Sequence, residues 1–342
     1  MANIAVIGAG AWGTALAIAL GRSGSHRVQL WSHGCEAAES IRSRRVNEPY
    51  LDGCPLPDSI EATNDLAEAL NGAEMVLSVM PSHHARRVWT EMKPFLRPEM
   101  LLVSATKGLE NDSLLRMSQV IDEVLRAGDG FAPKLCSISG PTFAREVAKG
   151  FPTTISVASA DPTLSAQVQE ALSDNAFRAY RCDDVIGLEL GGSVKNVIAI
   201  AAGIIDGLGF GHNTVAALIT RGLAEMTRLT LACGGKSETM AGLAGLGDLV
   251  LTCTGGLSRN RSVGVELGRG RKLDEIIAGM HGMVAEGVLT TNAALGLARK
   301  SGVEMPITEQ MHEILHRGKR PADAIRELMN RPLTQESVLV ER

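Results

Sequence analysis

The sequence predicts an α/β N-terminal domain with a doubly wound sheet over residues 1–185 and an all-α C-terminal domain over residues 186–342. The first half alternates short apolar runs with helical patterns, and the runs are nearly continuous, as in parallel strands covered on both faces. From about Asp184 onward the strand pattern disappears and long helical patterns replace it. A chain of 342 residues is long enough for two domains of ordinary size.

The expected strands of the first half are short. They cover residues 3–7, 28–31, 75–79, 101–104, 135–139, 153–157 and 177–181. One helix is expected to begin at Asp112, an N-cap candidate, and another at Asp161, where Pro162 would occupy the first helical position. In the second half, helices are expected over residues 192–208, 214–233, 273–278, 290–300, 309–316 and 321–329. The alternation of strand and helix predicts a doubly wound α/β domain.

The first expected strand ends in Gly8, Gly10 and Gly13, and the small and apolar run 14–20 follows at once. This is the order of strand, tight turn and helix that a dinucleotide-binding unit requires. Gly8 permits the turn, Gly10 lets the backbone approach a pyrophosphate, and Gly13 lets the helix pack close to the strand. The N-terminus of the helix then attracts the phosphates. The motif predicts bound NAD or NADP.

The end of the second expected strand bears on the choice between the two nicotinamide cofactors. NAD-preferring units place an acidic residue there, but this chain has none before Glu36. Ser32 and His33 can instead receive a 2′-phosphate, and nearby basic residues can add charge. Those residues are Arg42, Arg44 and Arg45, which can equally form the solvated face of a helix. We expect NADPH to be accepted at least as well as NADH.

Composition excludes several other classes of protein. The net charge of −4 favours neither nucleic acid nor an anionic membrane as a partner. The longest apolar stretch, 197–205, is too short to span a bilayer, and no signal peptide is expected. The six cysteines show no CxxC pattern and suit buried positions in a reducing compartment. His83 and His84 are adjacent, which suits surface residues better than metal ligands, so no metal site is expected.

Four polar segments stand out beyond the glycine turn. Two of them, 105–109 and 139–144, follow expected strands at the edge where ligands bind in such sheets. The third surrounds Lys195 and Asn196 in an otherwise apolar helix, and the fourth, 247–261, reads as polar groups in a glycine-rich loop. A lysine in so apolar a helix is either paired or functional, or else it lies at the helix edge with its amine in water. The residues alone leave both interpretations of Lys195 open.

The ordered motifs GAGAWGTALA, ATKGL, SGPTFA, SVKNVIAIAAG, GLGDLVLTCT, SRNR and AEGVLTT resemble the bacterial NAD(P)-dependent glycerol-3-phosphate dehydrogenases over essentially the whole chain. The resemblance implies a Rossmann-like domain followed by a helical domain of the 6-phosphogluconate dehydrogenase type. It implies interconversion of dihydroxyacetone phosphate and sn-glycerol 3-phosphate with NADPH or NADH, in support of glycerophospholipid synthesis. It also implies a homodimer, and the cysteine usage and the expected absence of a signal peptide predict a cytoplasmic protein.

The resemblance assigns roles to matching residues. Lys195 corresponds to the catalytic acid/base of the family, and Lys107 and Asp248 accompany it in the reaction. The substrate-contacting positions are Lys107, Gly140, Thr142, Lys195, Asp248, Ser258, Arg259 and Asn260. The cofactor-contacting positions, beside Gly8, Gly10 and Gly13, are Ala11, Trp12, His33, Lys107, Ala144, Arg259, Val284 and Glu286.

Two departures and two alternatives qualify this assignment. Ala11 stands where relatives often carry Ser, and Arg261 is followed by Ser262 and Val263 where many relatives carry a basic or aromatic residue. The nearest alternative enzyme is a β-hydroxyacid or 6-phosphogluconate dehydrogenase, which would lack the SRNR segment in this setting. The alternative of another class is a non-catalytic nicotinamide sensor, which would need no buried lysine.

Overall fold

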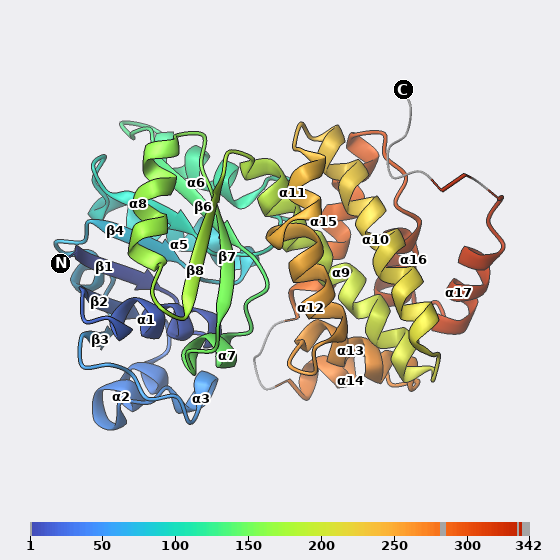
Figure 1. Cartoon of the computed structure of the whole chain (residues 1–342), viewed down its shortest axis with the longest axis horizontal. Helices are drawn as coiled ribbons and strands as arrows, with labels where there is room; N and C mark the ends of the chain where they lie inside the picture. The colour runs from blue at the N-terminus through green and yellow to red at the C-terminus, as the bar shows by residue number, and fades with distance from the viewer. Residues whose placement is uncertain (1, 281–284, 334, 337–342) are drawn as a thin grey trace. The chain divides into compact units, whose positions relative to one another are not determined.

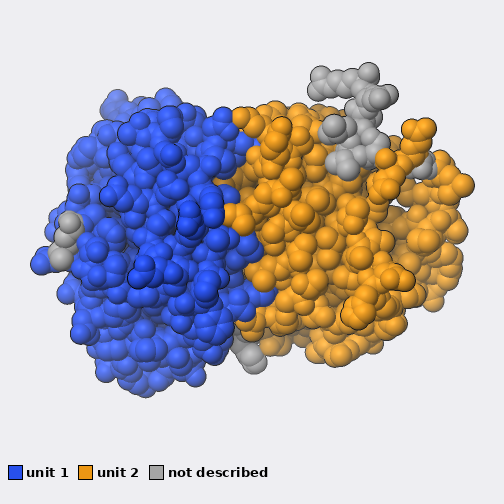
Figure 2. Space-filling model, in the orientation of Figure 1, with its two compact units in different colours: residues 1–106, 117–185 blue, residues 107–116, 186–342 orange. Residues whose placement is uncertain are grey.

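The computed structural model describes residues 2–280, 285–333, 335 and 336. The chain forms two compact units, which Figure 2 distinguishes by colour. Unit 1 comprises Met1–Thr106 and Met117–Val185, and unit 2 comprises Lys107–Arg116 and Ile186–Arg342. The segment 107–116, expected in the first domain, therefore groups with the helical unit.

Unit 1 contains an eight-stranded sheet in the order β3-β2-β1-β4-β5-β6-β7-β8. The strands are β1 (Ala2–Ile7), β2 (His26–Trp31), β3 (Ile60–Thr63), β4 (Met75–Ser78), β5 (Leu101–Ser104), β6 (Lys134–Ser139), β7 (Thr153–Ala158) and β8 (Phe177–Cys182). The doubly wound α/β class is confirmed, with the strand order reversing between β1 and β4. Two details differ from expectation: β7 pairs antiparallel with β6, and the short strand β3 was not predicted.

Helices cover both faces of this sheet. They are α1 (Ala11–Arg22), α2 (Cys35–Arg44), α3 (Glu48–Leu51), α4 (Leu66–Leu70), α5 (Ser82–Met92), the 3₁₀ turn η1 (Lys93–Phe95), α6 (Met117–Arg126), α7 (Ala144–Ala148) and α8 (Pro162–Leu172). In Figure 1, α8 lies across the face of the sheet nearest the viewer. Strands β4 and β5 are buried along their whole length. The core between these layers is built mainly from aliphatic side chains.

Of the two helix starts predicted in unit 1, one is right and one is wrong. Asp161 caps α8 by accepting a hydrogen bond from the backbone N–H of Thr163 at 2.8 Å. The helix expected at Asp112 begins instead at Met117. Leu114 has a φ of +61°, in the left-handed region, so the chain cannot continue there as a right-handed helix.

The regular elements among the described residues of unit 2 are helices, and its segment 107–116 is non-helical, with one antiparallel bridge between Leu109 and Arg116. The helices are α9 (Val185–Gly207), α10 (His212–Ala232), α11 (Ser237–Ala241), the π-type turn η2 (Leu243–Gly247), α12 (Asp248–Thr254), α13 (Arg259–Gly268), α14 (Leu273–Ala278), α15 (Glu286–Lys300), α16 (Pro306–Arg317) and α17 (Pro321–Met329). The residues from Asp248 to Thr254, expected in a loop, thus form a helix. Its spacing places Asp248 and Thr252 on one face.

The central helix of unit 2 is α9, which is buried from Gly187 to Ile205. It is long and apolar enough to cross a membrane, but its apolar window is fully buried inside the protein, as in a core helix. Glycines bring α9 and α13 close together: a Cβ at Gly203 would come within 2.0 Å of the Arg261 carbonyl oxygen, and one at Gly264 within 2.0 Å of that of Ile200. Such backbone contact fixes the start of α13 relative to α9.

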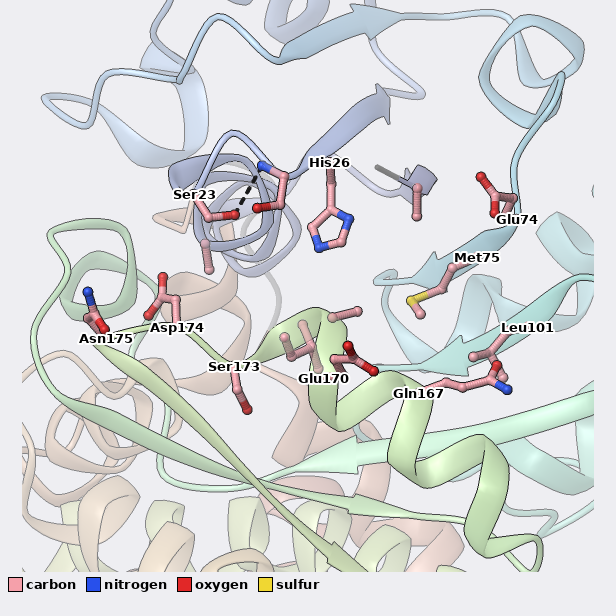
Figure 3. Close-up of a pocket in the computed structure, with 15 residues that line it drawn as sticks. Ser23, His26, Glu74, Met75, Leu101, Gln167, Glu170, Ser173, Asp174 and Asn175 are labelled. Atoms are coloured by element: carbon pink, nitrogen blue, oxygen red, sulfur yellow. Dashed lines mark hydrogen bonds between the residues drawn. The ribbon is translucent and has the colours of Figure 1, made fainter.

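A pocket opens at the amino edge of the sheet in unit 1, where β1, β2, β4 and β5 begin (Figure 3). Its polar lining includes His26, Glu74, Glu170 and Asp174. The turn after β1 lies at the other edge, where ligands bind in doubly wound sheets. Since none of the predicted site residues lines this pocket, the candidate site lies elsewhere.

Candidate functional site

The glycine turn after β1 has the geometry that its sequence predicts. Gly8 has a φ of +123°, and a Cβ there would come within 2.1 Å of the Val79 carbonyl oxygen. A Cβ at Gly13 would come within 1.8 Å of the Gly8 carbonyl oxygen, so α1 packs directly against the turn. A Cβ at Gly10 would meet nothing within 4 Å, so this side of the turn is open. Gly10 is the N-cap of α1, and its open side leaves room for a phosphate at the helix N-terminus.

Asn47 supports this turn and was not singled out from the sequence. It is fully buried, and its Nδ2 donates to the Ala9 carbonyl oxygen at 2.8 Å and to Thr14 Oγ1 at 2.7 Å. Ala11 and Trp12, which follow Gly10 in the turn, begin α1 and are half-buried. A single amide therefore ties the loop before α3 to the turn and to the first helix.

The end of β2 narrows the candidates for recognition of a 2′-phosphate. Ser32 is buried and donates its hydroxyl hydrogen to the Gly34 carbonyl oxygen at 2.8 Å. Arg44 pairs with Glu48 at 2.6 Å. Arg45 donates to the carbonyl oxygens of Ile60 and Pro57. Ser32 and Arg45 are thus engaged within the protein, whereas His33, Arg42 and Arg44 are exposed, Arg44 in a surface pair with Glu48.

The segment after β6 carries the remaining predicted residues of unit 1. Gly140 is buried, and a Cβ there would come within 3.1 Å of Ile155 Cα. Thr142 donates its hydroxyl to the Gly140 carbonyl oxygen at 3.2 Å, and the half-buried Ala144 begins α7. Because β1 and β6 run in the same direction through the sheet, the segment after β6 and the glycine turn after β1 both lie at the same edge of the sheet. Among the described residues, no group of three His, Cys, Asp or Glu side chains is arranged to hold a metal ion.

Unit 2 brings together the three predicted catalytic residues in one charged cluster. Lys195 Nζ on α9 donates to Asp248 Oδ1 on α12 at 2.7 Å. Lys107 Nζ donates to the other carboxylate oxygen, Oδ2, at 2.6 Å. Lys195 Nζ also donates to Thr252 Oγ1 at 2.7 Å, a contact that sequence reasoning missed. Lys195 is only 5% exposed, so its amine lies inside the protein and not in water at a helix edge.

The environment of this cluster moves the pKa values of its members. Burial lowers the pKa of Lys195 to about 8; the carboxylate of Asp248 opposes this change, and the ammonium of Lys107 adds to it. Burial alone would raise the pKa of Asp248, but the ammonium groups of Lys107 and Lys195 hold it below its usual range. Burial raises the pKa of the neighbouring Cys253 thiol to about 12. The pKa of Lys195 is therefore well below that of a free lysine, and the pKa of Asp248 is below that of a free aspartate.

The start of α13 presents the predicted phosphate-binding residues. Ser258 is its N-cap and accepts from the Arg261 N–H at 3.2 Å, and the next residue, Arg259, is exposed. Asn260 is buried; its Nδ2 donates to Asn196 Oδ1 at 3.0 Å and its Oδ1 accepts from the Gly287 N–H at 2.9 Å. These bonds fix α13 to α9 and α15.

One predicted cofactor position lies at the start of α15. Glu286 is the first residue of that helix, and its carboxylate attracts the Arg259 guanidinium. Val284 lies outside the described residues.

Comparison with known proteins places the chain in a family. Residues 3–165 match the family described as "NAD-dependent glycerol-3-phosphate dehydrogenase N-terminus", and residues 184–326 match the corresponding C-terminus. The chain is 66% identical over 336 residues to "Glycerol-3-phosphate dehydrogenase [NAD(P)+]" of Koribacter versatilis, covering 98% of this chain and 99% of the relative. It is 54% identical over 335 residues to the protein of the same name from Acidobacterium capsulatum, covering 97% and 99%.

A solved structure of a similar protein has the same fold over nearly the whole chain. The crystal structure of glycerol-3-phosphate dehydrogenase from Coxiella burnetii has a TM-score of 0.91 and 44% identity, covering 96% of this chain and 99% of that chain. The fold predicted from sequence is therefore the fold of a solved relative. The chain belongs to the NAD-dependent glycerol-3-phosphate dehydrogenase family.

Proposed function

We propose that the chain reduces dihydroxyacetone phosphate to sn-glycerol 3-phosphate with NAD(P)H, reversibly, and that Lys195 moves the proton. Family membership makes the chain an oxidoreductase that uses NAD(P). The single observation that carries the role of Lys195 is its buried amine, held by Asp248 and Thr252 in the helical unit. We assign the pyrophosphate of the cofactor to the glycine turn of unit 1, and the reacting carbon of the substrate to the charged cluster of unit 2.

The proton chemistry of Lys195 follows from its surroundings. A bound nicotinamide supplies the hydride that reduces C2 of the substrate. An ammonium directed at the C2 oxygen stabilises the negative charge that develops there and donates its proton. In the oxidation direction the neutral amine removes the hydroxyl proton. A pKa near 8 makes both forms accessible close to neutral pH.

The neighbours of Lys195 hold it in place and set its charge. Asp248 accepts from both lysines and fixes the direction of the Lys195 amine. Thr252 accepts a second hydrogen of that amine and donates its own hydroxyl hydrogen to the backbone of Asp248 at 2.6 Å. Lys107, less buried than Lys195, offers a second cation to the substrate oxygens.

The phosphate of the substrate suits the start of α13. Arg259 offers a planar fork of donors that stays charged at every working pH. Asn260 uses one amide hydrogen for Asn196 and keeps a second one for an anion. Ser258 precedes them as the helix N-cap. We propose that Gly140 and Thr142 contribute to the same substrate.

The cofactor is assigned to the glycine turn and the residues around it. The open side of Gly10 at the start of α1 suits a pyrophosphate. His33 lies just after β2 and is exposed, as are Arg42 and Arg44 of α2, and these side chains support acceptance of NADPH at least as well as NADH. The other proposed contacts are Ala11, Trp12, Lys107, Ala144, Arg259, Val284 and Glu286.

The test is oxidation of NADPH and of NADH with dihydroxyacetone phosphate, followed at 340 nm, beside unphosphorylated dihydroxyacetone. Turnover that requires the phosphate supports the reaction. A large preference for NADH in kcat/KM would contradict the assignment of His33. Protein that binds NADPH but does not turn over would instead support a hydroxyacid dehydrogenase or a nicotinamide sensor.

We also propose that the enzyme is a cytoplasmic homodimer. The dimer is the assembly that the resemblance of the sequence motifs implies. All six cysteines are free thiols in the structure, which suits a reducing compartment. Sedimentation equilibrium tests the dimer, and cell fractionation tests the compartment.

A further inference from the structure

The ten residues Lys107–Arg116 belong to the helical unit, although the chain on either side of them belongs to unit 1. Their last residue, Arg116, donates to Glu189 Oε2 on α9 at 2.7 Å. The two side chains are only 14% and 5% exposed, so this is a largely buried ion pair. The mechanism proposed above does not use either residue.

A second contact holds the other end of the segment. The N–H of Gly108, which follows Lys107 directly, donates to Ser193 Oγ at 3.0 Å. Ser193 in turn donates to the Glu189 carbonyl oxygen at 2.6 Å. Glu189 and Ser193 are one turn apart on α9, and Lys195 lies on the same helix. One helix therefore fixes both ends of the segment and carries the proposed catalytic amine.

Apolar packing holds the middle of the segment. Leu109 and Leu114 pack with Leu190 of α9 and with α15. Leu114 is in the left-handed region, which a leucine adopts only where its surroundings over-determine it. Gly296 of α15 makes room for this side chain, because a Cβ there would come within 2.9 Å of Leu114 Cδ2.

We propose that Arg116 and Glu189 are positioning residues for the reaction, because their ion pair fixes the segment 107–116 on α9 and so holds Lys107 against Asp248 beside Lys195. This inference rests on the proposed role of Lys195. It gives the pair a function beyond stability, since loosening the segment moves a cation away from the reacting group.

The charged and titratable groups near Lys195 decide how its pKa responds to the position of Lys107. Those groups are Lys107 on the segment, Asp248 and Cys253 on α12, and Arg261 on α13, which faces Cys253 and pairs with Asp206 at 2.9 Å. The ammonium of Lys107 disfavours a second positive charge and also shares the carboxylate of Asp248. Withdrawing Lys107 therefore raises the pKa of Lys195 from about 8.

The experiment compares Arg116→Gln with Arg126→Gln. Arg126 forms an exposed ion pair with Asp122 on α6 and serves as the matched control. For Arg116→Gln we expect kcat to fall by roughly 10- to 100-fold, because a small misplacement of a substrate-positioning group is costly. We expect the apparent pKa of glycerol 3-phosphate oxidation to rise by ~0.5–1 unit. Arg126→Gln should match the wild type in both.

A purely structural role predicts a different result. Arg116→Gln would then lower the melting temperature while kcat and the pH profile of the folded enzyme stayed at their wild-type values, which would overturn the proposal. If Arg116→Gln does not fold, Ser193→Ala tests the same segment by removing the acceptor of the Gly108 N–H, and the same alkaline shift is expected. Arg116→Lys keeps the charge beside Glu189 and should restore most of the wild-type profile.

The same assay separates the two proposals. An inactive Lys195→Ala enzyme together with an unshifted Arg116→Gln profile would sink only the positioning role of the ion pair. An active Lys195→Ala enzyme would remove the proposed acid/base itself.

Discussion

Asp248 and Glu225 are both fully buried carboxylic acids of the helical unit, yet their pKa values move in opposite directions. Asp248 lies between two ammonium groups at 2.6 and 2.7 Å, and its pKa is held below the usual range. Burial raises the pKa of Glu225 to about 7, although the N–H groups of Ile307 and Thr308 and the Thr308 hydroxyl donate to it.

The difference lies in what compensates the loss of water. Glu225, on α10, accepts hydrogen bonds from the first turn of α16, which stabilise its charge but do not offset its burial. The charge of Asp248 is compensated by two full positive charges, and burial lowers the pKa of Lys195 to about 8 although this carboxylate opposes the change. A buried carboxyl group thus anchors the start of α16 in one place and holds two buried or partly buried ammonium groups together in the other.

The largest effect should come from removing Lys195 itself. Lys195→Ala removes the proposed proton donor and the charge proposed to face the developing oxyanion, so kcat should fall by roughly 10² to 10⁴ while cofactor binding survives. Steady-state kinetics and cofactor fluorescence titration measure the two quantities. Lys300→Ala, an exposed lysine at the end of α15, is the control. A near-normal kcat would remove Lys195 from the mechanism.

Asp248→Asn breaks the compensation and leaves two cations facing a neutral amide. Removing one partner of a buried charge cluster typically costs about 3–5 kcal/mol of stability. The pKa of Lys195 should fall further below about 8, because the opposing carboxylate is gone. Urea unfolding near pH 7.5 and the pH–rate profile test these outcomes. Asp122→Asn, in an exposed pair, should leave both unchanged.

Glu225→Gln tests the other carboxyl group through the pH dependence of stability. Because its folded pKa of about 7 lies above the unfolded value, the folded state binds the extra proton. The stability from this proton is fully present below the unfolded pKa and is lost as pH rises through about 7. The glutamine variant lacks this dependence, so relative to the wild type it should gain roughly 2–3 kcal/mol between pH 5 and pH 8. Urea unfolding at the two pH values measures this, with Glu123→Gln as an exposed control. A difference in unfolding free energy between Glu225→Gln and the wild type that is the same at both pH values would contradict the prediction.

Sequence patterns predicted the parts of the molecule that depend on local chemistry. The glycine turn could be predicted from the sequence because only glycine fits at positions 8 and 13, where a Cβ would overlap backbone atoms. The short strand β3 was missed because four residues, one of them the exposed Glu61, give no apolar run.

The errors at the site arise from tertiary contacts. Leu114 adopts a left-handed conformation only because the segment packs on another part of the chain, so the helix predicted at Asp112 was wrong. Thr252 was missed because its neighbourhood reads as a glycine-rich loop, whereas it lies one helical turn after Asp248. The sequence left open whether Lys195 was paired, since its partners lie more than fifty residues away.

The smallest expected effect concerns a charge at the surface of the same unit. Arg259 is exposed at the start of α13, so its replacement leaves no uncompensated charge in the interior. Arg259→Lys keeps the charge but loses the planar fork, and KM for dihydroxyacetone phosphate should rise by roughly 10-fold at nearly constant kcat. Arg269→Lys, in an exposed pair with Glu266 just after the same helix, should leave KM unchanged. An unchanged KM in both variants would mean that the phosphate binds elsewhere, whereas a loss of kcat would mean that Arg259 acts on the transition state and belongs with the buried cluster.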